Sequence, residues 1–165
     1  MPNWTRVNQD TLRCHVASEA QTRDAGQQIA GSLHAGDVIA LIGNLGAGKT
    51  RFVKAVAEAF GVPLDEVNSP TFTLIQEYEG RVLIRHCDTY RLRNPDEFAD
   101  LGLDELFAPD GIALVEWADR VEEYLPRDRL TIRITIDSPT ARTIEVSATG
   151  RRSRQIVSEL ANEGG

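Results

Sequence analysis

The sequence predicts an α/β fold in three layers, and three patterns along its 165 residues support this. The apolar run 38–42 lies between turn signals, which is typical of a strand buried on both faces. A glycine-rich loop, 43–48, follows it directly. Apolar side chains then recur at helical spacing as far as Gly61. Strands and helices that alternate around such a loop are expected to form a sheet with helices on both faces.

The region before this loop predicts a strand and a helix. Residues 11–16 are interpreted as an edge strand. Ser18 and Gln21 form a capping-box pattern that begins a helix, and Gly36 is expected to end it. This helix has three apolar residues at the spacing of one face: Ala25, Ile29 and Leu33.

The middle of the chain predicts three strands and a second helix start. Residues 72–78 and 82–87 are expected to be strands joined by a Glu-Gly turn. Asn94, followed by proline and two acids, is typical of a helix N-terminus. The apolar run 112–115 is a further short strand, and it ends at Glu116.

The C-terminal part predicts a hairpin and an amphipathic helix. Residues 130–136 and 143–146 alternate in polarity on either side of a Ser-Pro-Thr turn. A hairpin here makes the sheet mixed rather than purely parallel. The tail from Arg151 is interpreted as a helix with three inward residues: Ile156, Val157 and Leu160.

Composition excludes several classes of protein. There is no repeat or linker, so we expect one domain over residues 1–165. Eighteen basic and twenty-five acidic residues give a net charge of −7, which disfavours a basic module that binds nucleic acid alone. Cys14 and Cys87 are too few for a disulfide framework and are expected to be reduced thiols. The chain lacks a signal-peptide pattern and a membrane-length apolar run, so we expect a cytoplasmic protein without membrane association.

The strongest motif begins at Gly43 and reads Gly-Asn-Leu-Gly-Ala-Gly-Lys-Thr, the P-loop pattern. Its glycines let backbone N–H groups surround a phosphate, and the following helix presents its positive N-terminus to the same anion. Lys49 is expected to reach the β- and γ-phosphates, and Thr50 to bind Mg²⁺. The predicted nucleotide-binding residues of this motif are Asn44, Leu45, Gly46, Ala47, Gly48, Lys49 and Thr50.

Two acids follow predicted strands. Glu116 ends an apolar strand in the Walker-B form, which favours a metal-binding or water-orienting role over that of a solvated strand end. Asp88 follows the strand 82–87 and is either a second acid beside Mg²⁺ or a residue that caps a turn. His86 is interpreted as structural. Arg91 and Arg93 contact either a phosphate or a partner, or form surface ion pairs.

Two further segments permit two interpretations each. The segment 69–73, Ser-Pro-Thr-Phe-Thr, occupies the position of a phosphate-sensing switch in P-loop proteins, and its hydroxyls could reach Mg²⁺ or the attacking water. Equally, it could be a proline turn before a strand. Trp117 is either an exposed interface residue or part of the core.

Together these motifs resemble the TsaE family, the small P-loop ATPases of bacterial tRNA threonylcarbamoyladenosine biosynthesis. The resemblance covers roughly residues 18–146. The segments that carry it are Gly43–Thr50, Ser69–Thr73, His86–Leu92 and Leu114–Trp117. The P-loop alone is common to many families, whereas the other three segments together are more specific.

The resemblance implies a role for each matching position. Lys49, Asp88 and Glu116 match catalytic positions, and Thr50, Asp88 and Glu116 match the metal side of the site. Ser18 and Thr22 match a segment near the nucleotide, and Trp117 a tryptophan beside the site. The switch positions are Ser69, Thr71 and Thr73. Asn44 and Arg51 depart from the family pattern, which usually has Asp and a small hydroxyl residue there.

The resemblance further implies an accessory ATPase that uses ATP and Mg²⁺. Its partners would be the threonylcarbamoyl transferase TsaD and the inactive relative TsaB, with tRNA held by the complex in the bacterial cytoplasm. The alternative is a small-metabolite P-loop kinase, which usually has an Arg-rich lid; here a predicted hairpin follows Glu116 instead. A GTPase is disfavoured because neither lysine follows an asparagine. A non-catalytic module is disfavoured by the two acids.

Overall fold

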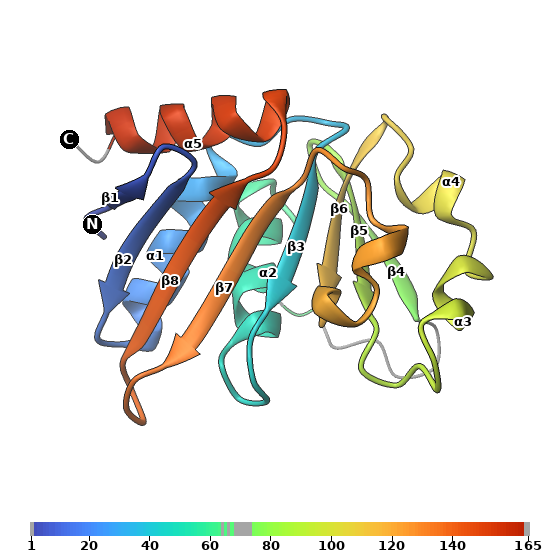
Figure 1. Ribbon diagram of the computed structural model, residues 1–165, viewed down its shortest axis with the longest axis horizontal. Helices are drawn as coiled ribbons and strands as arrows, with labels where there is room; N and C mark the ends of the chain where they lie inside the picture. Colours follow the sequence, from blue (N-terminus) through green and yellow to red (C-terminus); the bar gives the residue numbers. More distant parts are fainter. Residues whose placement is uncertain (1, 64, 66, 68–73, 164–165) are drawn as a thin grey trace.

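The computed structural model describes residues 2–63, 65, 67 and 74–163. Within them, eight strands form one sheet in the order β1-β2-β8-β7-β3-β6-β5-β4 (Figure 1). The central strands β7, β3, β6 and β5 are parallel, and the flanking pairs are antiparallel. The strands are β1 Thr5–Asn8, β2 Thr11–Val16, β3 Val38–Ile42, β4 Ile75–Glu79, β5 Leu83–Asp88, β6 Gly111–Glu116, β7 Leu130–Ile136 and β8 Arg142–Ala148.

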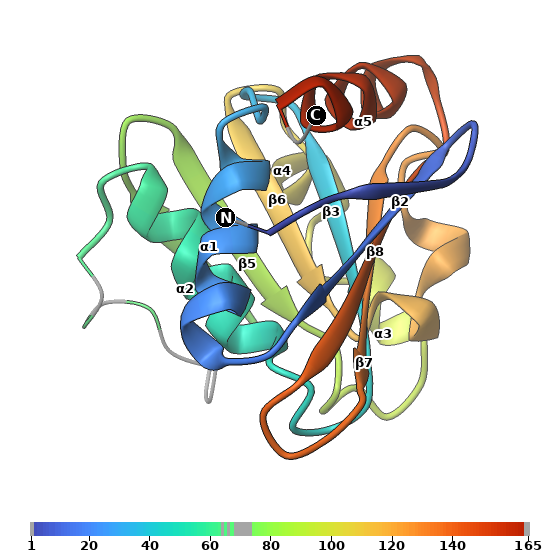
Figure 2. The same ribbon diagram turned by 90° about the vertical axis from the view of Figure 1, so that its left-hand side faces the viewer.

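Helices cover both faces of the central strands, in agreement with the expected layers (Figure 2). On one face pack α1 (Glu19–Ala30), α2 (Lys49–Ala59) and α5 (Arg151–Glu163). On the other pack α3 (Asp96–Ala99), α4 (Leu103–Leu106) and the two 3₁₀ turns Ala118–Arg120 and Glu122–Tyr124.

The apolar run of β3 is explained by this double cover. Ile39 and Leu41 belong to the core beneath α1 and α2, whereas Val38, Ala40 and Ile42 belong to the core beneath α3 and α4. Successive side chains of a strand point to opposite faces, so a strand between two cores must be apolar at every position.

The predicted mixed sheet, the β7–β8 hairpin and the tail helix are confirmed. Two details are wrong. The strand 11–16 is not at the edge, because β1 pairs outside it through Thr5 and Arg13; β1 is fully exposed and so has no apolar alternation to reveal it. The first helix ends at Ala30 rather than at Gly36, because the chain tightens there and the N–H of Gly31 bonds back to two helix carbonyls.

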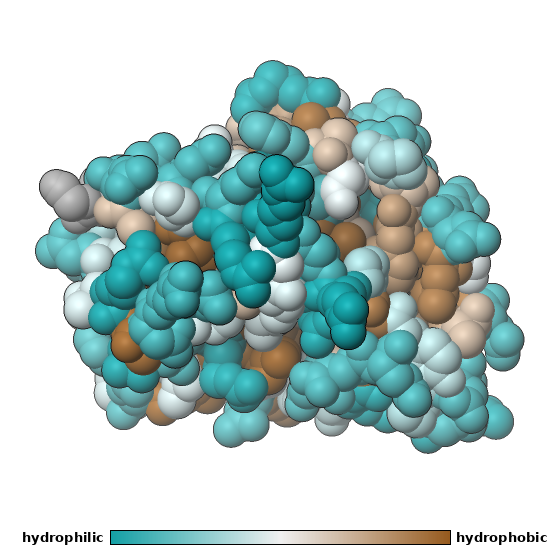
Figure 3. All heavy atoms as spheres, turned by 45° about the horizontal axis from the view of Figure 1, so that its top comes forward, coloured by the Kyte–Doolittle hydropathy of each residue, from teal (hydrophilic) through white to brown (hydrophobic). Residues whose placement is uncertain are grey.

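The molecular surface and the two cysteines can both be compared with what the composition predicts. The side of the molecule that carries α5 is mostly hydrophilic, with scattered hydrophobic residues (Figure 3). None of the described helices is long and apolar enough to cross a membrane. Cys14 and Cys87 are free and buried, and burial raises the pKa of each thiol to about 12.

Candidate functional site

The glycine-rich loop connects the end of β3 to the start of α2, as predicted. Gly48 is the N-cap of α2 and has a φ of +106°, which glycine adopts without strain. A Cβ atom at Gly43 would lie 2.7 Å from the carbonyl oxygen of Ile134, so this position has no room for a side chain. The loop therefore brings backbone N–H groups and the N-terminus of α2 to one place.

Lys49 is the first residue of α2, and its side chain folds back onto the loop. Its Nζ donates hydrogen bonds to the carbonyl oxygens of Gly43 at 2.5 Å and Asn44 at 2.9 Å. The same Nζ is 4.0 Å from the ring centroid of Trp117, within the range of a cation–π contact. Burial lowers the pKa of Lys49, and the negative charges of Glu116 and Asp88 oppose that effect.

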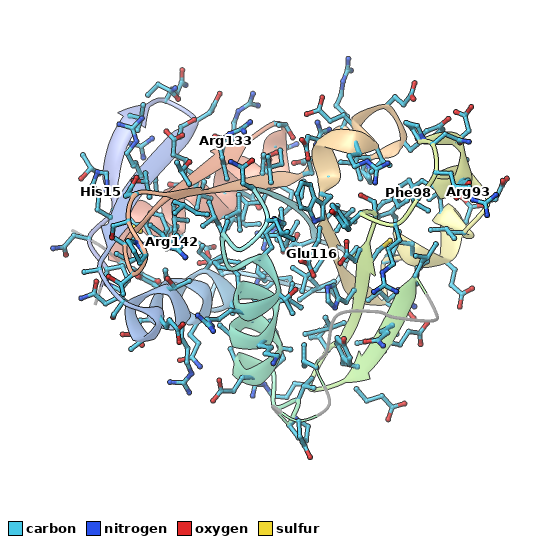
Figure 4. All side chains as sticks on the ribbon, turned by 90° about the horizontal axis from the view of Figure 1, so that it is seen from below. His15, Arg93, Phe98, Glu116, Arg133 and Arg142 are labelled. Atoms are coloured by element: carbon cyan, nitrogen blue, oxygen red, sulfur yellow. The ribbon has the colours of Figure 1, made fainter. Side chains whose placement is uncertain are left out.

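The two predicted acids and Thr50 meet at one cavity. Asp88 and Glu116 are the last residues of β5 and β6 and face each other in the parallel register. Thr50 donates a hydrogen bond from Oγ1 to the Glu116 carboxylate, at 3.1 Å to Oε1. A cavity of about 340 Å³ is lined by these residues and by Leu45, Gly46, Gly48, Lys49, Arg51, Tyr90 and Trp117. Figure 4 views the molecule from below relative to Figure 1, and Glu116 lies near the centre of that view.

Asp88 caps a turn, which is one of its two predicted roles, and it also lies at the cavity. Its Oδ1 accepts a hydrogen bond from the N–H of Tyr90 at 3.0 Å, so it caps the turn after β5. It also lines the cavity beside Glu116. Burial raises the pKa of Asp88; the Tyr90 N–H and the charge of Lys49 oppose this, while the charge of Glu116 adds to it.

His86 has a closer relation to this site than its structural interpretation implied. The side chain is fully buried, and its Nε2 forms a hydrogen bond with Oε2 of Glu116. On the other side of the ring, Nδ1 lies 3.1 Å from the hydroxyl of Tyr78. The signal in the sequence is the two-residue spacing from Asp88, which places both side chains on one face of a strand.

Trp117 begins the turn after Glu116. Its φ is +57°, the only positive φ among the described residues other than glycine, and such a conformation persists when the surroundings hold it. The hydroxyl of Thr89 donates to the carbonyl oxygens of Glu116 and Trp117. The indole ring packs against Tyr90 with 4.9 Å between centroids. Trp117 is partly exposed over the cavity, between its two predicted environments.

Ser18 and Thr22 lie on the other side of the loop. Ser18 caps α1 by accepting the N–H of Gln21, and the Thr22 hydroxyl donates to the carbonyl oxygen of Ser18. Both line a second cavity of about 230 Å³ that also touches Gly46, Ala47 and Gly48. Arg142, which the sequence did not single out, closes this cavity from β8.

Three predicted residues lie at the margin of the site. Leu45 lines the cavity although it is 72% exposed, whereas Arg91 and Arg93 are exposed beyond β5 and are not among the residues that line it. The switch residues Ser69, Thr71 and Thr73 lie outside the described residues. Among residues 2–63, 65, 67 and 74–163, no group of three or more His, Cys, Asp or Glu side chains is arranged to hold a metal ion.

A parallel strand, a glycine-rich loop and a helix that presents Lys49 and Thr50 to an acid on the neighbouring strand define a nucleotide-binding protein of the P-loop class. The family model of the threonylcarbamoyl adenosine biosynthesis protein TsaE matches residues 16–144. The chain belongs to this family, whose members take part in tRNA threonylcarbamoyladenosine biosynthesis. The resemblance inferred from the motifs is therefore confirmed.

Relatives and a solved structure support the assignment along nearly the whole chain. The TsaE protein of Bacillus subtilis is 43% identical over 151 residues, which is 91% of this chain and 94% of the relative. The TsaE protein of Treponema pallidum is 38% identical, over 82% of this chain and all of the relative. The crystal structure of YdiB from Bacillus subtilis superposes with a TM-score of 0.79 at 36% identity and covers 94% of this chain and 97% of its own.

Proposed function

We propose that this protein is a Mg²⁺-dependent ATPase with a P-loop NTPase fold that serves as an accessory subunit in tRNA N6-threonylcarbamoyladenosine formation. The observation that carries the proposal is the contact between Thr50 of the P-loop and Glu116 of β6, beside Lys49. P-loop NTPases use a lysine for the phosphates and a Ser/Thr with a strand-end acid on the metal side.

The residues fit Mg²⁺ by their chemistry. Thr50, Glu116 and Asp88 offer oxygen atoms only, and Mg²⁺ is usually held by one or two carboxylates together with phosphate oxygens and waters. When bound, the ion neutralises charge on the β- and γ-phosphates. The scarcity of protein ligands is therefore the expected arrangement for this ion, rather than for zinc.

Lys49 would bind the β- and γ-phosphates after exchanging its two carbonyl contacts for phosphate oxygens. Loop residues 44–48 would surround the phosphates with N–H groups. Glu116 or Asp88 would orient a water whose oxygen attacks the γ-phosphorus as the bond to the β–γ bridging oxygen breaks, which yields ADP and phosphate. Ser18 and Thr22 would lie beside the nucleoside, Trp117 beside the phosphates, and Ser69, Thr71 and Thr73 would sense the γ-phosphate.

Hydrolysis would be coupled to the transferase rather than used for a separate product. We propose TsaD- and TsaB-type proteins as partners in the bacterial cytoplasm, with tRNA held by the complex. The net charge of −7 is consistent with a subunit that does not grip tRNA by itself.

The test is ATP hydrolysis with Mg²⁺, measured as ADP release, for the protein alone and with the cognate TsaD–TsaB pair. We expect slow hydrolysis alone and a clear rise with the pair. Phosphate transfer to a small-molecule acceptor, without a response to the pair, would support a kinase and contradict the proposal.

A further inference from the structure

Arg142 connects the β7–β8 turn to the P-loop. It is the first residue of β8, and its guanidinium donates hydrogen bonds to four backbone carbonyl oxygens. Two belong to the turn, Ser138 at 2.8 Å and Ala141 at 2.9 Å. Two belong to the P-loop, Ala47 at 3.0 Å and Gly46 at 3.2 Å. One side chain thus fastens two segments that are about ninety positions apart in the sequence.

These contacts determine how the peptide groups of the loop point. The described chain has no cis peptide, so each C=O points opposite to the N–H of the next residue. The carbonyl of Ala47 is held toward Arg142, which directs the N–H of Gly48 away from the guanidinium. Gly48 lines the cavity with Lys49 and Thr50. Arg142 therefore orients a peptide N–H of the kind that a P-loop uses to bind phosphate.

No acid among the described residues neutralises the charge of Arg142 through an ion pair. In the part of the chain that the structure describes, Arg142 takes part in no ion pair, and its four acceptors are uncharged carbonyls. A guanidinium beside the loop therefore adds a positive potential where an anion would bind. Arg51 also lines the cavity that Arg142 shares with Ser18 and Thr22. Its charge, unlike that of Arg142, is paired with an acid, Glu19, at 2.5 Å.

We propose that Arg142 is a positioning residue for the nucleotide: it pre-orients the P-loop peptides and contributes positive charge to the phosphate site. This inference rests on the proposed function, because it assumes that the loop binds a nucleotide. A loop that is oriented before binding loses less conformational entropy when the ligand arrives, so its affinity is higher.

The variants Arg142→Met and Arg142→Lys separate the two contributions. Methionine removes the donors and the charge, whereas lysine keeps the charge but cannot bridge four carbonyls. The control is Arg133→Met, the same chemical change on the adjacent strand β7. Arg133 is exposed and, by alternation with the buried Ile132 and Ile134, faces the opposite side of the sheet (Figure 4).

The readouts are the Kd for ATP and ADP by calorimetry, KM and kcat for hydrolysis, and the thermal midpoint. We expect Arg142→Met to raise Kd and KM about tenfold or more with kcat at saturating ATP nearly unchanged, which is the signature of lost binding that does not change between ground and transition state. Arg142→Lys should give a smaller rise, and Arg133→Met should behave as wild type.

A lowered thermal midpoint in Arg142→Met, with its Kd and KM within about twofold of wild type, would show that Arg142 only holds the hairpin. If Arg142→Met does not fold, the result for Arg142→Lys decides. A wild-type protein that binds no nucleotide would contradict the proposed function itself, which is a different outcome from variants that bind as well as wild type.

Discussion

The hydroxyl of Thr50 donates hydrogen bonds to both carboxylate oxygens of Glu116, at 3.1 and 3.2 Å, although the residues are 66 positions apart. The reason is the parallel pairing of β3 with β6, which places Leu41 opposite Glu116 just before the chain enters the loop. The first turn of α2 therefore begins directly beside the strand-end acid.

Replacing Glu116 by glutamine should separate binding from hydrolysis. Glutamine keeps the shape and can still accept from Thr50, but it lacks the negative charge. We expect ATP affinity within several-fold of wild type and hydrolysis slowed on the order of 10²–10⁴-fold. Calorimetry and ADP release measure the two quantities. Unchanged turnover would remove Glu116 from the catalytic residues.

Lys49→Ala should abolish measurable ATP binding, because it removes the cation expected to contact the β- and γ-phosphates. The chain has one other lysine, Lys54, five positions further along α2, so Lys54→Ala is a matched control. Equilibrium binding of a fluorescent ATP analogue would distinguish the two variants. Equal affinity in both would argue against the assigned role of the loop.

His86→Leu should slow hydrolysis more than it weakens binding, because it leaves the buried Glu116 carboxylate without its imidazole partner. Glu116 keeps its hydrogen bond from Thr50 but loses the one to His86, and a hydrogen bond to a charged group contributes about 1.5–3 kcal/mol, so the free energy of unfolding should also fall. His86→Gln, which can still hydrogen-bond Glu116, should recover part of the activity. Full loss of activity in the glutamine variant at wild-type stability would indicate a role beyond positioning.

The stability of the nucleotide-free protein should depend on pH through Asp88. Burial raises the pKa of this carboxyl, so the folded state holds the proton more tightly than the unfolded state does. The free energy of unfolding should therefore fall as pH rises from the ordinary aspartate pKa to the raised one, and this contribution should be constant above it. Asp88→Asn should lack that slope and hydrolyse ATP more slowly. Urea unfolding at several pH values tests this, and identical pH profiles would contradict it.

A side chain at Gly26 should lower the stability of the protein, because Gly26 lies where α1 packs against α2. A Cβ atom there would lie 2.9 Å from the Cβ of Ala55. By helix propensity alone, Gly26→Ala would raise the free energy of unfolding by up to about 1 kcal/mol. We expect a net loss of about 1–3 kcal/mol from overpacking instead. Urea denaturation measures this loss. The variant Ala20→Gly, at an exposed position of α1, measures in the same experiment how much exchanging alanine and glycine changes stability through helix propensity alone.

Much of the fold could be predicted because its signals are local. The strand–loop–helix unit around 38–61, the β7–β8 hairpin and the helix from Arg151 each carry their own periodicity and turn residues. Two features carry no such signal and were not predicted. β1 is exposed at every position, and α1 ends at Ala30, where the N–H of Gly31 makes backbone hydrogen bonds that no side-chain pattern indicates.

The sequence by itself determined which chemical groups are present: a phosphate-binding loop, a lysine, a hydroxyl and two strand-end acids, recognisable because each depends on a short run of residues. The tertiary structure alone decided which of them meet. The order of strands brings Thr50 and His86 to the same carboxylate, and the β7–β8 hairpin brings Arg142 to the carbonyls of the loop. These contacts join residues far apart along the chain, and they depend on strand order and side-chain direction, which no local pattern encodes.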